Sequence, residues 1–307
     1  MPPGLPAPDR WPDRAATLHR LGGETMGTSW RATAVAGPDL DTAALAAAIH
    51  RDFEAVCDAL STWRPASEIS RFNRAPAGSR VPVSGLFAAV LGRALEIAAL
   101  TGGAFDPTVG GWRQGHDRIG RWRDVELDRR NRTATQPGGL VLELSAIAKG
   151  HAVDRLSARL AEAGAVSHLA EIGGEFVGRG VKPDRRPWWV ALERLGSGRD
   201  GDPQTLVALS DAALATSGYR TRTGRPLGEL IDPRSGRPYA GDTLAVSVLT
   251  GCCGDADAFA TGLLVMGPEK GMAAADAHGL AARFLIRTRQ GVEARLSRAM
   301  AAMDGPS

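Results

Sequence analysis

The chain has 307 residues and a net charge of +3, and 43% of its residues are hydrophobic, which allows a large buried core and excludes general disorder. Of its 37 Lys and Arg residues only Lys149, Lys182 and Lys270 are lysine, and 34 acidic residues balance them. The basic pI near 9.0 therefore does not indicate a nucleic-acid-binding groove.

The ends of the chain and its cysteines predict a protein that is neither exported nor membrane-spanning. No basic segment followed by an apolar run opens the chain, and no apolar run approaches the ~18 residues of a membrane helix. Cys57, Cys252 and Cys253 are odd in number and lack metal-ligand spacing, which argues against a disulfide framework or a structural zinc site. We expect a cytoplasmic protein with reduced thiols.

The first part of the chain carries signals for one strand and two helices. Residues 1–20 are rich in proline and predict a mobile leader, and the alternation at 30–36 predicts a strand. Asp41 caps a helix that extends to about Leu60 on an apolar stripe. A second helix begins at Ser84 and ends at the glycine pair 102–103.

The rest of the chain mixes strands and helices without strict alternation. Residues 111–135 predict an irregular excursion. The predicted strands are 140–144, 166–172, 187–193, 205–209, 243–249 and 281–288, and the predicted helices are 147–163, 255–266 and one that begins at Pro268. This order favours an α+β fold with mixed or antiparallel sheets packed with helices. We expect one domain over residues 21–290, followed by a tail at 291–307.

Two hexapeptides repeat one pattern. The segments 105–110 and 231–236 both read apolar-Asp-Pro-x-x-Gly. One interpretation is two related loops that line one cleft. The other is ordinary Asp-Pro turn chemistry, which alone explains such segments and which the spacing favours.

The segment 143–150 combines a carboxylate, a turn and a lysine. Glu143 ends the predicted strand, and Lys149 lies in the first turns of the helix that follows. Free N–H groups at a helix start, together with a compact ammonium, can hold phosphate. The alternative is a surface lysine on an amphipathic helix, an interpretation that the scarcity of lysine in this chain weakens.

Asp257 and Thr261 lie four residues apart on a predicted helix. Their oxygens therefore share one face, and a carboxylate with a hydroxyl, completed by phosphate and water, suits Mg²⁺. The alternative is an acidic helix start stabilised by the dipole, worth about 0.3–1 kcal/mol. Spacing alone favours the latter.

Taken together, these segments resemble the FAD:protein FMN transferase (ApbE) family from about Gly23 to Gly271. The order and spacing of short motifs carry the resemblance. The motifs are Met26-Gly27-Thr28, Leu60-Ser61-Thr62-Trp63, 67–73, Gly103-Ala104-Phe105-Asp106-Pro107-Thr108, Ala148-Lys149-Gly150, Ile172-Gly173-Gly174, Ala215-Thr216-Ser217-Gly218, Ile231-Asp232-Pro233 and Ala256-Asp257-Ala258.

The resemblance implies an ApbE-like fold and two sets of site residues. The set that would hold FAD comprises Met26, Trp63, Ala104, Phe105, Asp106, Glu143, Lys149 and Ile231, with Trp63 placed to stack on a ring of the ligand. The set that would hold Mg²⁺ comprises the backbone of Ala146 and the side chains of Asp257 and Thr261.

The resemblance also implies a reaction. A Thr or Ser hydroxyl of an acceptor flavoprotein, a subunit of a redox complex, would attack the FMN phosphate of FAD, and AMP would leave. Positioning and electrostatics supply most of the help in phosphoryl transfer, so no nucleophile of the enzyme is required. The alternatives are an FAD-binding protein without transferase activity and a slow FAD pyrophosphatase that forms FMN and AMP.

Three positions depart from the family pattern. Glu229 stands where the family commonly has a histidine, and it would have to deprotonate the incoming hydroxyl. Glu143 replaces the usual aspartate, which lengthens the side chain by one methylene. Ala260 stands where some relatives carry aspartate, so the metal would have one carboxylate fewer.

Overall fold

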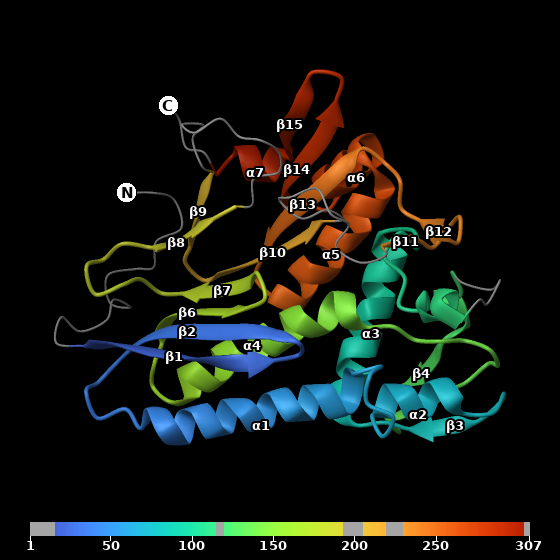
Figure 1. Cartoon of the computed structure of the whole chain (residues 1–307), viewed down its shortest axis with the longest axis horizontal. Coiled ribbons are helices and arrows are strands. Elements are labelled where there is room, and N and C mark those ends of the chain that lie inside the picture. The colour runs from blue at the N-terminus through green and yellow to red at the C-terminus, as the bar shows by residue number, and fades with distance from the viewer. Residues whose placement is uncertain (1–15, 115–119, 193–204, 219–229, 304–307) are drawn as a thin grey trace.

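A computed structural model describes residues 16–114, 120–192, 205–218 and 230–303 of the chain (Figure 1). Its centre is an antiparallel sheet of eight strands in the order β1-β2-β6-β7-β10-β13-β14-β15. These strands are β1 (Thr17–Thr25), β2 (Thr28–Ala36), β6 (Ser167–Ile172), β7 (Glu175–Arg179), β10 (Ala212–Gly218), β13 (Thr243–Thr250), β14 (Ala281–Thr288) and β15 (Gly291–Leu296).

Three smaller sheets accompany the central one. They consist of β3 (Arg80–Pro82), β5 (Thr133–Thr135) and β4 (Glu126–Asp128); β8 (Trp188–Ala191) and β9 (Leu206–Leu209); and β11 (Ile231–Asp232) and β12 (Arg237–Pro238). Their pairings are antiparallel as well, and an isolated parallel bridge joins Val109 to Val141. Together with the helices, these sheets confirm the α+β class.

Helices cover one face of the central sheet (Figure 1). The α-helices are α1 (Thr42–Leu60), α2 (Glu68–Arg74), α3 (Gly85–Leu100), α4 (Ser145–Glu162), α5 (Cys253–Met266), α6 (Pro268–Ala277) and α7 (Arg298–Ala301). Two 3₁₀ turns, η2 (Gly110–Gln114) and η3 (Trp122–Asp124), lie in the segment for which we predicted irregular structure.

Alternation along the strands divides the core into two parts. Side chains such as Ala170 of β6 and Val246 of β13 point to the helices and join the main core. Their neighbours of opposite parity, such as Leu249, pack with Trp188 of the β8–β9 hairpin on the other face. The main core centres on Trp30, whose ring meets Phe53 of α1 edge-on at 5.5 Å between centroids. Both faces of the sheet are therefore covered.

The sheet extends further toward both ends of the chain than we predicted. β1 begins at Thr17, inside the segment expected to be a mobile leader, and β15 occupies 291–296, where we expected a tail. Both are edge strands, and their side chains are mostly exposed. They therefore lack the apolar alternation by which a strand is recognised in a sequence.

The strand predicted at 140–144 is absent. The segment is extended and buried, but beyond the isolated bridge at Val141 and the bond from the Glu143 N–H to the Pro107 carbonyl, side chains satisfy much of its backbone. Asn73 Nδ2 donates to the Leu142 carbonyl at 3.0 Å and Asn73 Oδ1 accepts from the Leu142 N–H at 2.8 Å. Gln136 bonds the Leu140 carbonyl and N–H in the same manner. The apolar composition of this segment reflects its burial, and its pairing with another segment is limited to one isolated bridge.

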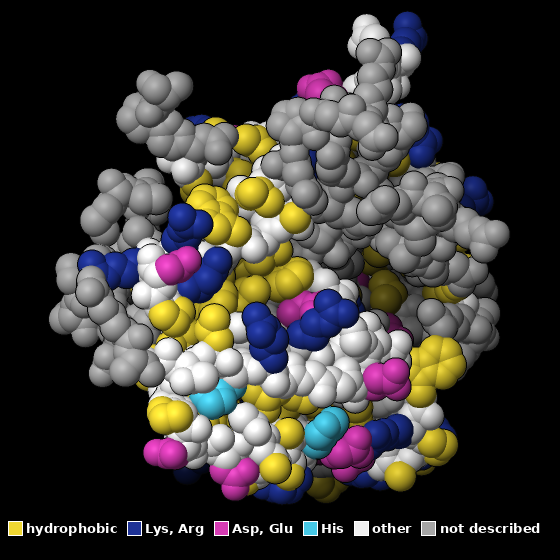
Figure 2. All heavy atoms as spheres, turned by 60° about the vertical axis from the view of Figure 1, so that its left-hand side comes forward, with side chains coloured by type: hydrophobic (Ala, Val, Ile, Leu, Met, Phe, Trp, Pro, Cys, Tyr) yellow, Lys and Arg dark blue, Asp and Glu magenta, His cyan; other side chains and the backbone are white. Residues whose placement is uncertain are grey.

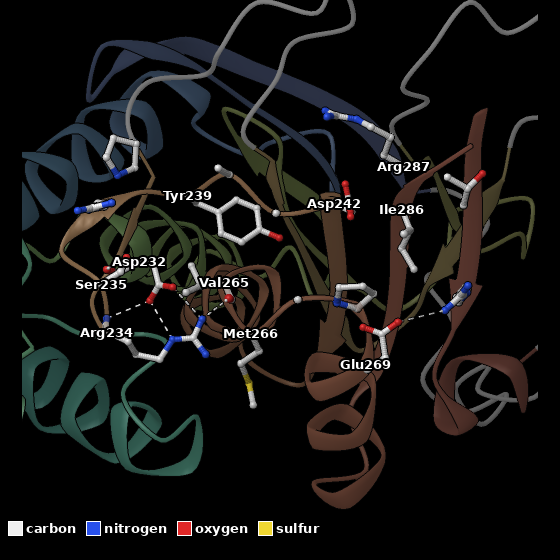
Figure 3. Close-up of a pocket in the computed structure, with 18 residues that line it drawn as sticks. Asp232, Arg234, Ser235, Tyr239, Asp242, Val265, Met266, Glu269, Ile286 and Arg287 are labelled. Atoms are coloured by element: carbon white, nitrogen blue, oxygen red, sulfur yellow. Dashed lines mark hydrogen bonds and ion pairs between the residues drawn. The ribbon is translucent and has the colours of Figure 1, made fainter. Parts of the chain in front are cut away.

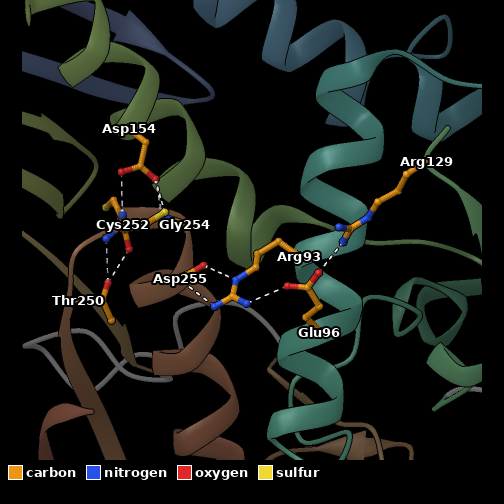
Figure 4. A network of polar contacts seen from close by, with 9 residues as sticks. Arg93, Glu96, Arg129, Asp154, Thr250, Cys252, Gly254 and Asp255 are labelled. Atoms are coloured by element: carbon orange, nitrogen blue, oxygen red, sulfur yellow. Dashed lines mark hydrogen bonds and ion pairs between the residues drawn. The ribbon is translucent and has the colours of Figure 1, made fainter. Parts of the chain in front are cut away.

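Helices α4 and α5 meet at Gly150 with no room for a side chain. A Cβ at this position would lie 2.3 Å from the Cys253 carbonyl oxygen and 2.8 Å from the Gly254 Cα. Asp154 of α4 also accepts the N–H groups of Cys253 and Gly254, at 2.8 and 2.9 Å, and so caps the start of α5 (Figure 4). This cap satisfies donors that a helix start leaves open.

An ion-pair network joins α5 to α3. Arg93 of α3 makes a bidentate pair with Asp255 of α5 at 2.8 Å and also bonds Glu96, which in turn pairs with Arg129 (Figure 4). Bidentate Arg–carboxylate pairs fix orientation as well as distance. The start of α5 is therefore held from two sides, by α4 and by α3.

We predict that Gly150→Ala destabilises the protein by about 1–3 kcal/mol, because the added methyl group collides with backbone that cannot rotate away. Gly85→Ala is the matched control, since a Cβ there meets no atom within 4 Å and the residue is also helical. Urea denaturation should show a lower midpoint for Gly150→Ala and an unchanged or higher one for Gly85→Ala. Equal midpoints for the two variants would contradict the tight contact.

Candidate functional site

A cavity of about 640 Å³ opens between the β1–β2 turn, the end of α1 and the start of α4. Apolar groups and a few polar ones line it, among them Met26, Leu60, Trp63 and Lys149. Trp63 is 83% exposed at the mouth, an unusual place for an indole ring in a folded chain. A recess of about 360 Å³ on the other side of Trp63 shares Glu143 with the cavity.

A smaller cavity of about 130 Å³ adjoins the first, and Glu143 and Ser145 line both. Its remaining walls come from segments distant in sequence: residues 104–106, Ala146, Ile231 and Thr261. The two cavities thus bring together every FAD-contacting residue implied by the family resemblance.

The two Asp-Pro segments lie on this smaller cavity together. Phe105 and Asp106 come from one segment and Ile231 and Pro233 from the other. Each aspartate also accepts the N–H two residues ahead, Asp106 from Thr108 at 2.7 Å and Asp232 from Arg234 at 3.0 Å. Both interpretations of the repeat therefore hold: the turns are ordinary Asx turns, and they line one cleft.

Met26 has a strained backbone. It forms the two-residue turn between β1 and β2 together with Gly27, and both residues have positive φ, 50° and 74°. The mirror-image turn suits the twist of a hairpin but disfavours a long side chain at its first position. A methionine kept there, on the cavity wall, points to a role for its side chain.

Asp106 is buried, and its carboxylate is only half satisfied. Oδ1 accepts from the N–H and the hydroxyl of Thr108, at 2.7 and 2.6 Å, whereas Oδ2 has no hydrogen-bond partner among the described residues. Burial raises the pKa of this carboxyl to about 6, against the lowering effects of the Thr108 hydrogen bonds and of the Trp122 backbone N–H, which is too poorly placed to count as a hydrogen-bond partner of Oδ2. An unsatisfied buried oxygen in a cavity wall is suited to a polar group of a ligand.

Glu143 occupies the start of α4. Its Oε1 accepts the Ser145 N–H at 2.9 Å, while the N–H groups of Ile147 and Ala148 bond the Leu144 carbonyl. Most of the N–H groups that we expected to be free for phosphate are thus used within the protein. Lys149, which reaches the large cavity, is then the main donor for an anion on this side.

Three charged side chains lie together beneath the cavity. Lys149 forms an ion pair with Glu175 of β7, and Asp257 of α5 accepts the Gly150 N–H at 3.1 Å. Burial alone would lower the pKa of Lys149, but the carboxylates of Asp257 and Glu175 outweigh it and raise that pKa. The Lys149 ammonium is therefore held in its charged form. Burial raises the pKa of both the Glu175 and the Asp257 carboxyl groups.

Of the three implied metal residues, Ala146 of α4 and Thr261 of α5 line the smaller cavity, whereas Asp257 of α5 lines neither cavity. Asp257 is 4% exposed, and its Oδ1 has no hydrogen-bond partner among the described residues. The Gly150 N–H, which an α-helix would direct to the Ala146 carbonyl, goes to Asp257 and so competes with that helical bond. Thr261 lies one turn further along α5, where Ser217 of β10 bonds its hydroxyl at 2.8 Å.

This donor set consists of a carboxylate, a hydroxyl and a carbonyl, and such hard oxygens suit Mg²⁺ better than a soft metal. Within residues 16–114, 120–192, 205–218 and 230–303, no group of three His, Cys, Asp or Glu side chains is arranged as a metal site. A cation here would therefore depend on backbone, hydroxyl, water and ligand oxygens as well as on Asp257.

Sequence reasoning found most of these residues and missed two. Glu229, the residue at the family's histidine position, lies outside the described residues. Glu175 and Ser217 were not singled out for chemistry, although Ser217 belongs to a motif that we quoted and Glu175 directly follows another. The glycine pair before Glu175 signals a tight turn, but nothing in the sequence says that this turn aims a carboxylate at α4.

A separate groove of about 680 Å³ lies between the β11–β12 hairpin, the start of α6 and the β14–β15 hairpin (Figure 3). Its charges largely pair among themselves. Arg234 points to Asp232 with contacts of 2.9 Å and also donates to the Val265 carbonyl, and Arg295 reaches Glu269 at 3.9 Å (Figure 3). None of the implied FAD or metal residues lines this groove, although Asp232, next to Ile231, does.

The surface does not display one continuous charged patch on the face shown in Figure 2. Lys and Arg side chains there alternate with Asp, Glu and apolar side chains. No helix in the part of the chain described by the structure is both long and apolar enough for a membrane span.

Comparison with known proteins places the chain in a family. The profile of the ApbE family matches residues 26–284. The FAD:protein FMN transferase of Vibrio cholerae is 34% identical, with 91% of this chain and 90% of that protein covered, and the one of Klebsiella pneumoniae is 29% identical over 92% and 88%.

Solved structures agree with this assignment. The flavin transferase ApbE from Vibrio cholerae superposes with a TM-score of 0.82 at 32% identity, covering 94% of this chain and 99% of that one. The apo form of the Pseudomonas stutzeri flavinyl transferase ApbE gives 0.85 at 29% identity, covering 95% and 98%. The family profile spans the segments from residue 26 to residue 261 that line the two cavities, the fold is shared, and the chain belongs to the ApbE family of transferases.

Proposed function

We propose that the protein transfers FMN from FAD to a Thr or Ser hydroxyl of an acceptor flavoprotein and releases AMP. One observation carries the proposal: two adjoining cavities share Glu143 and Ser145, with Lys149 on one side and Thr261 on the other. A dinucleotide has two ring systems joined by a diphosphate, and this arrangement offers an apolar wall, a cation and oxygen donors in that order. The names of the relatives support the same activity.

The protein's own residues can do three things for FAD. Trp63, Met26 and Leu60 offer apolar and aromatic surface to a ring, and the Trp63 indole can stack on it. The Lys149 ammonium can bind diphosphate oxygens as a point charge. Asp106 Oδ2, which has no partner among the described residues, can accept a hydrogen bond from the ligand.

Asp257, Thr261 and the Ala146 carbonyl would hold Mg²⁺. A bound Mg²⁺ supplies charge neutralisation where negative charge develops on the phosphate. Asp257 contributes its free oxygen, and Ser217 fixes the orientation of the Thr261 hydroxyl. Ala260, where some relatives carry aspartate, adds no oxygen here, so the site depends on a single carboxylate.

The chemistry forms one bond and breaks one. The acceptor oxygen bonds the phosphorus of the FMN half, the bond from that phosphorus to the bridging oxygen breaks, and the bridging oxygen leaves on AMP. The acceptor's proton must be removed as the new bond forms, and Glu229 is the candidate base by its sequence position. Lys149 stabilises the charge that develops on the leaving side.

We expect that the protein, FAD, Mg²⁺ and a flavin-acceptor domain together yield a flavin that remains on the acceptor after denaturation, with one AMP per flavin attached. In-gel fluorescence and chromatography measure the two products. AMP released equally without acceptor would indicate hydrolysis instead. Tight FAD binding without AMP under either condition would contradict turnover altogether.

Removing the charge of the Asp257 carboxylate should abolish the dependence of turnover on Mg²⁺. For Asp257→Asn we expect a loss of Mg²⁺-dependent turnover of about a hundredfold or more, because a neutral amide binds a hard cation weakly. Asp255→Asn is the matched control, since that carboxylate lies on the same helix as Asp257 but pairs with Arg93 of α3. Mg²⁺ titration of both variants tests the prediction, and an unchanged Mg²⁺ response in Asp257→Asn would remove this residue from the site.

Replacing the strained Met26 should affect FAD binding much more than it affects folding. Met26→Gly should change the free energy of unfolding by less than about 1 kcal/mol, since glycine tolerates positive φ. It should weaken FAD binding about tenfold through lost side-chain contact. Arg132→Gly, at another turn with φ of 50°, should leave FAD binding unchanged. Flavin fluorescence titration measures the FAD dissociation constants of both variants. Equal dissociation constants for Met26→Gly and the wild-type protein would contradict a role for Met26.

A further inference from the structure

Glu175 is a buried charged residue that the proposed function does not use. It is the first residue of β7, directly after the glycines at 173 and 174, whose φ values are 60° and 103°. This turn lies beside the β1–β2 turn that carries Met26, since the Gly173 N–H donates to the Ser29 carbonyl at 3.1 Å. The fold therefore brings Glu175 to the edge of the sheet that faces the large cavity.

The ion pair between Glu175 and Lys149 is asymmetric. The Glu175 side chain is 3% exposed, whereas that of Lys149 is 36% exposed. Glu175 Oε1 accepts from the Lys149 ammonium, and Oε2 has no partner among the described residues. The carboxylate thus lies below the cavity floor, and the ammonium reaches the cavity above it. A buried carboxylate with a single partner is costly for the fold, which argues for a use of that partner.

A second carboxylate competes for the same ammonium. Asp257 also acts on Lys149 electrostatically, but its hydrogen bond comes from the Gly150 N–H. An ammonium has three N–H donors, and one goes to Glu175. If Glu175 were neutral, Asp257 would be the remaining anion close to the ammonium. Lys149 would then turn toward α5 and pair with the Asp257 oxygen that a cation needs.

We propose that Glu175 is a positioning residue of the FAD site: it anchors the Lys149 ammonium under the cavity so that two N–H groups face the diphosphate and Asp257 stays open to a cation. This rests on the proposed function for the identity of the ligand. Glu175 itself touches neither the ligand nor the reacting atoms. Its effect passes through Lys149 alone.

The test is a double-mutant cycle on FAD affinity, measured by flavin fluorescence with the full-length protein. Glu175→Gln and Lys149→Met should each weaken FAD binding by about tenfold or more, the scale usual for the partner of a site residue. Glu175→Gln made in the Lys149→Met background should have no further effect on the dissociation constant. Glu171→Gln is the matched control, since its carboxylate serves the same turn by accepting the Gly174 N–H at 3.2 Å.

Thermal unfolding separates positioning from damage to the fold. Lys149→Met leaves a buried carboxylate unpaired, so this variant should melt below the double variant, in which that charge is gone. If Glu175 acted only on the stability of the fold, the two substitutions would lower the melting temperature additively. They would also lower the FAD affinity additively. Additive losses of affinity would overturn the inference, and so would an unchanged affinity in Glu175→Gln.

The inference and the proposed function can fail separately. Normal FMN transfer, with FAD affinity unchanged in Glu175→Gln, would overturn only the positioning role. The expected coupling, without FMN transfer to any acceptor, would overturn only the transferase. A wild-type chain that does not bind FAD would overturn both.

Discussion

The approach of α4 to α5 at Gly150 is the constraint on which the site depends. One backbone passes the other so closely that only hydrogen fits at the crossing, and Asp154 fastens the start of α5 to α4. α4 contributes Ala146 and Lys149, and α5 contributes Asp257 and Thr261. Because the crossing fixes the distance between the helices, it also fixes the spacing between the cation of one and the oxygens of the other. Gly150 thus sets the geometry of the candidate site through the packing of the two helices alone.

The charges at this centre form an ordered set. Two buried carboxylates lie beside one ammonium, and each carboxylate makes a different hydrogen bond: Glu175 with Lys149, and Asp257 with the Gly150 backbone. Both carboxylates act electrostatically on Lys149, but only Glu175 takes a hydrogen bond from it, and burial makes this division important because an unpaired buried charge is expensive. The resulting excess of negative charge favours a cation from solution, and the ammonium favours an anionic ligand beside it.

Local signals in the sequence predicted the helices well, since Asp41, Ser84 and Pro268 mark starts that the structure retains. Edge strands β1 and β15 escaped prediction because exposed strands need no apolar alternation. Residues 140–144 were mistaken for a strand because a buried extended segment and a buried strand have the same apolar composition. For the site, the family resemblance named residues of which the FAD set, Ala146 and Thr261 line the two cavities, whereas Asp257 lines neither. Glu175 and Ser217 could not be found in this way, because their importance comes from neighbours more than twenty residues away.

The scattering of the site along the chain has a thermodynamic consequence. Its residues come from turns, loops and helices between positions 26 and 261, so no fragment of the chain holds a working subset. A nucleotide that fills the cavities binds the folded state alone and adds its binding free energy to that of folding. At about a hundred times the dissociation constant, this linkage amounts to about 2.7 kcal/mol. The melting temperature of the chain is therefore a gauge of site occupancy, with which nucleotides can be ranked before any acceptor protein is in hand.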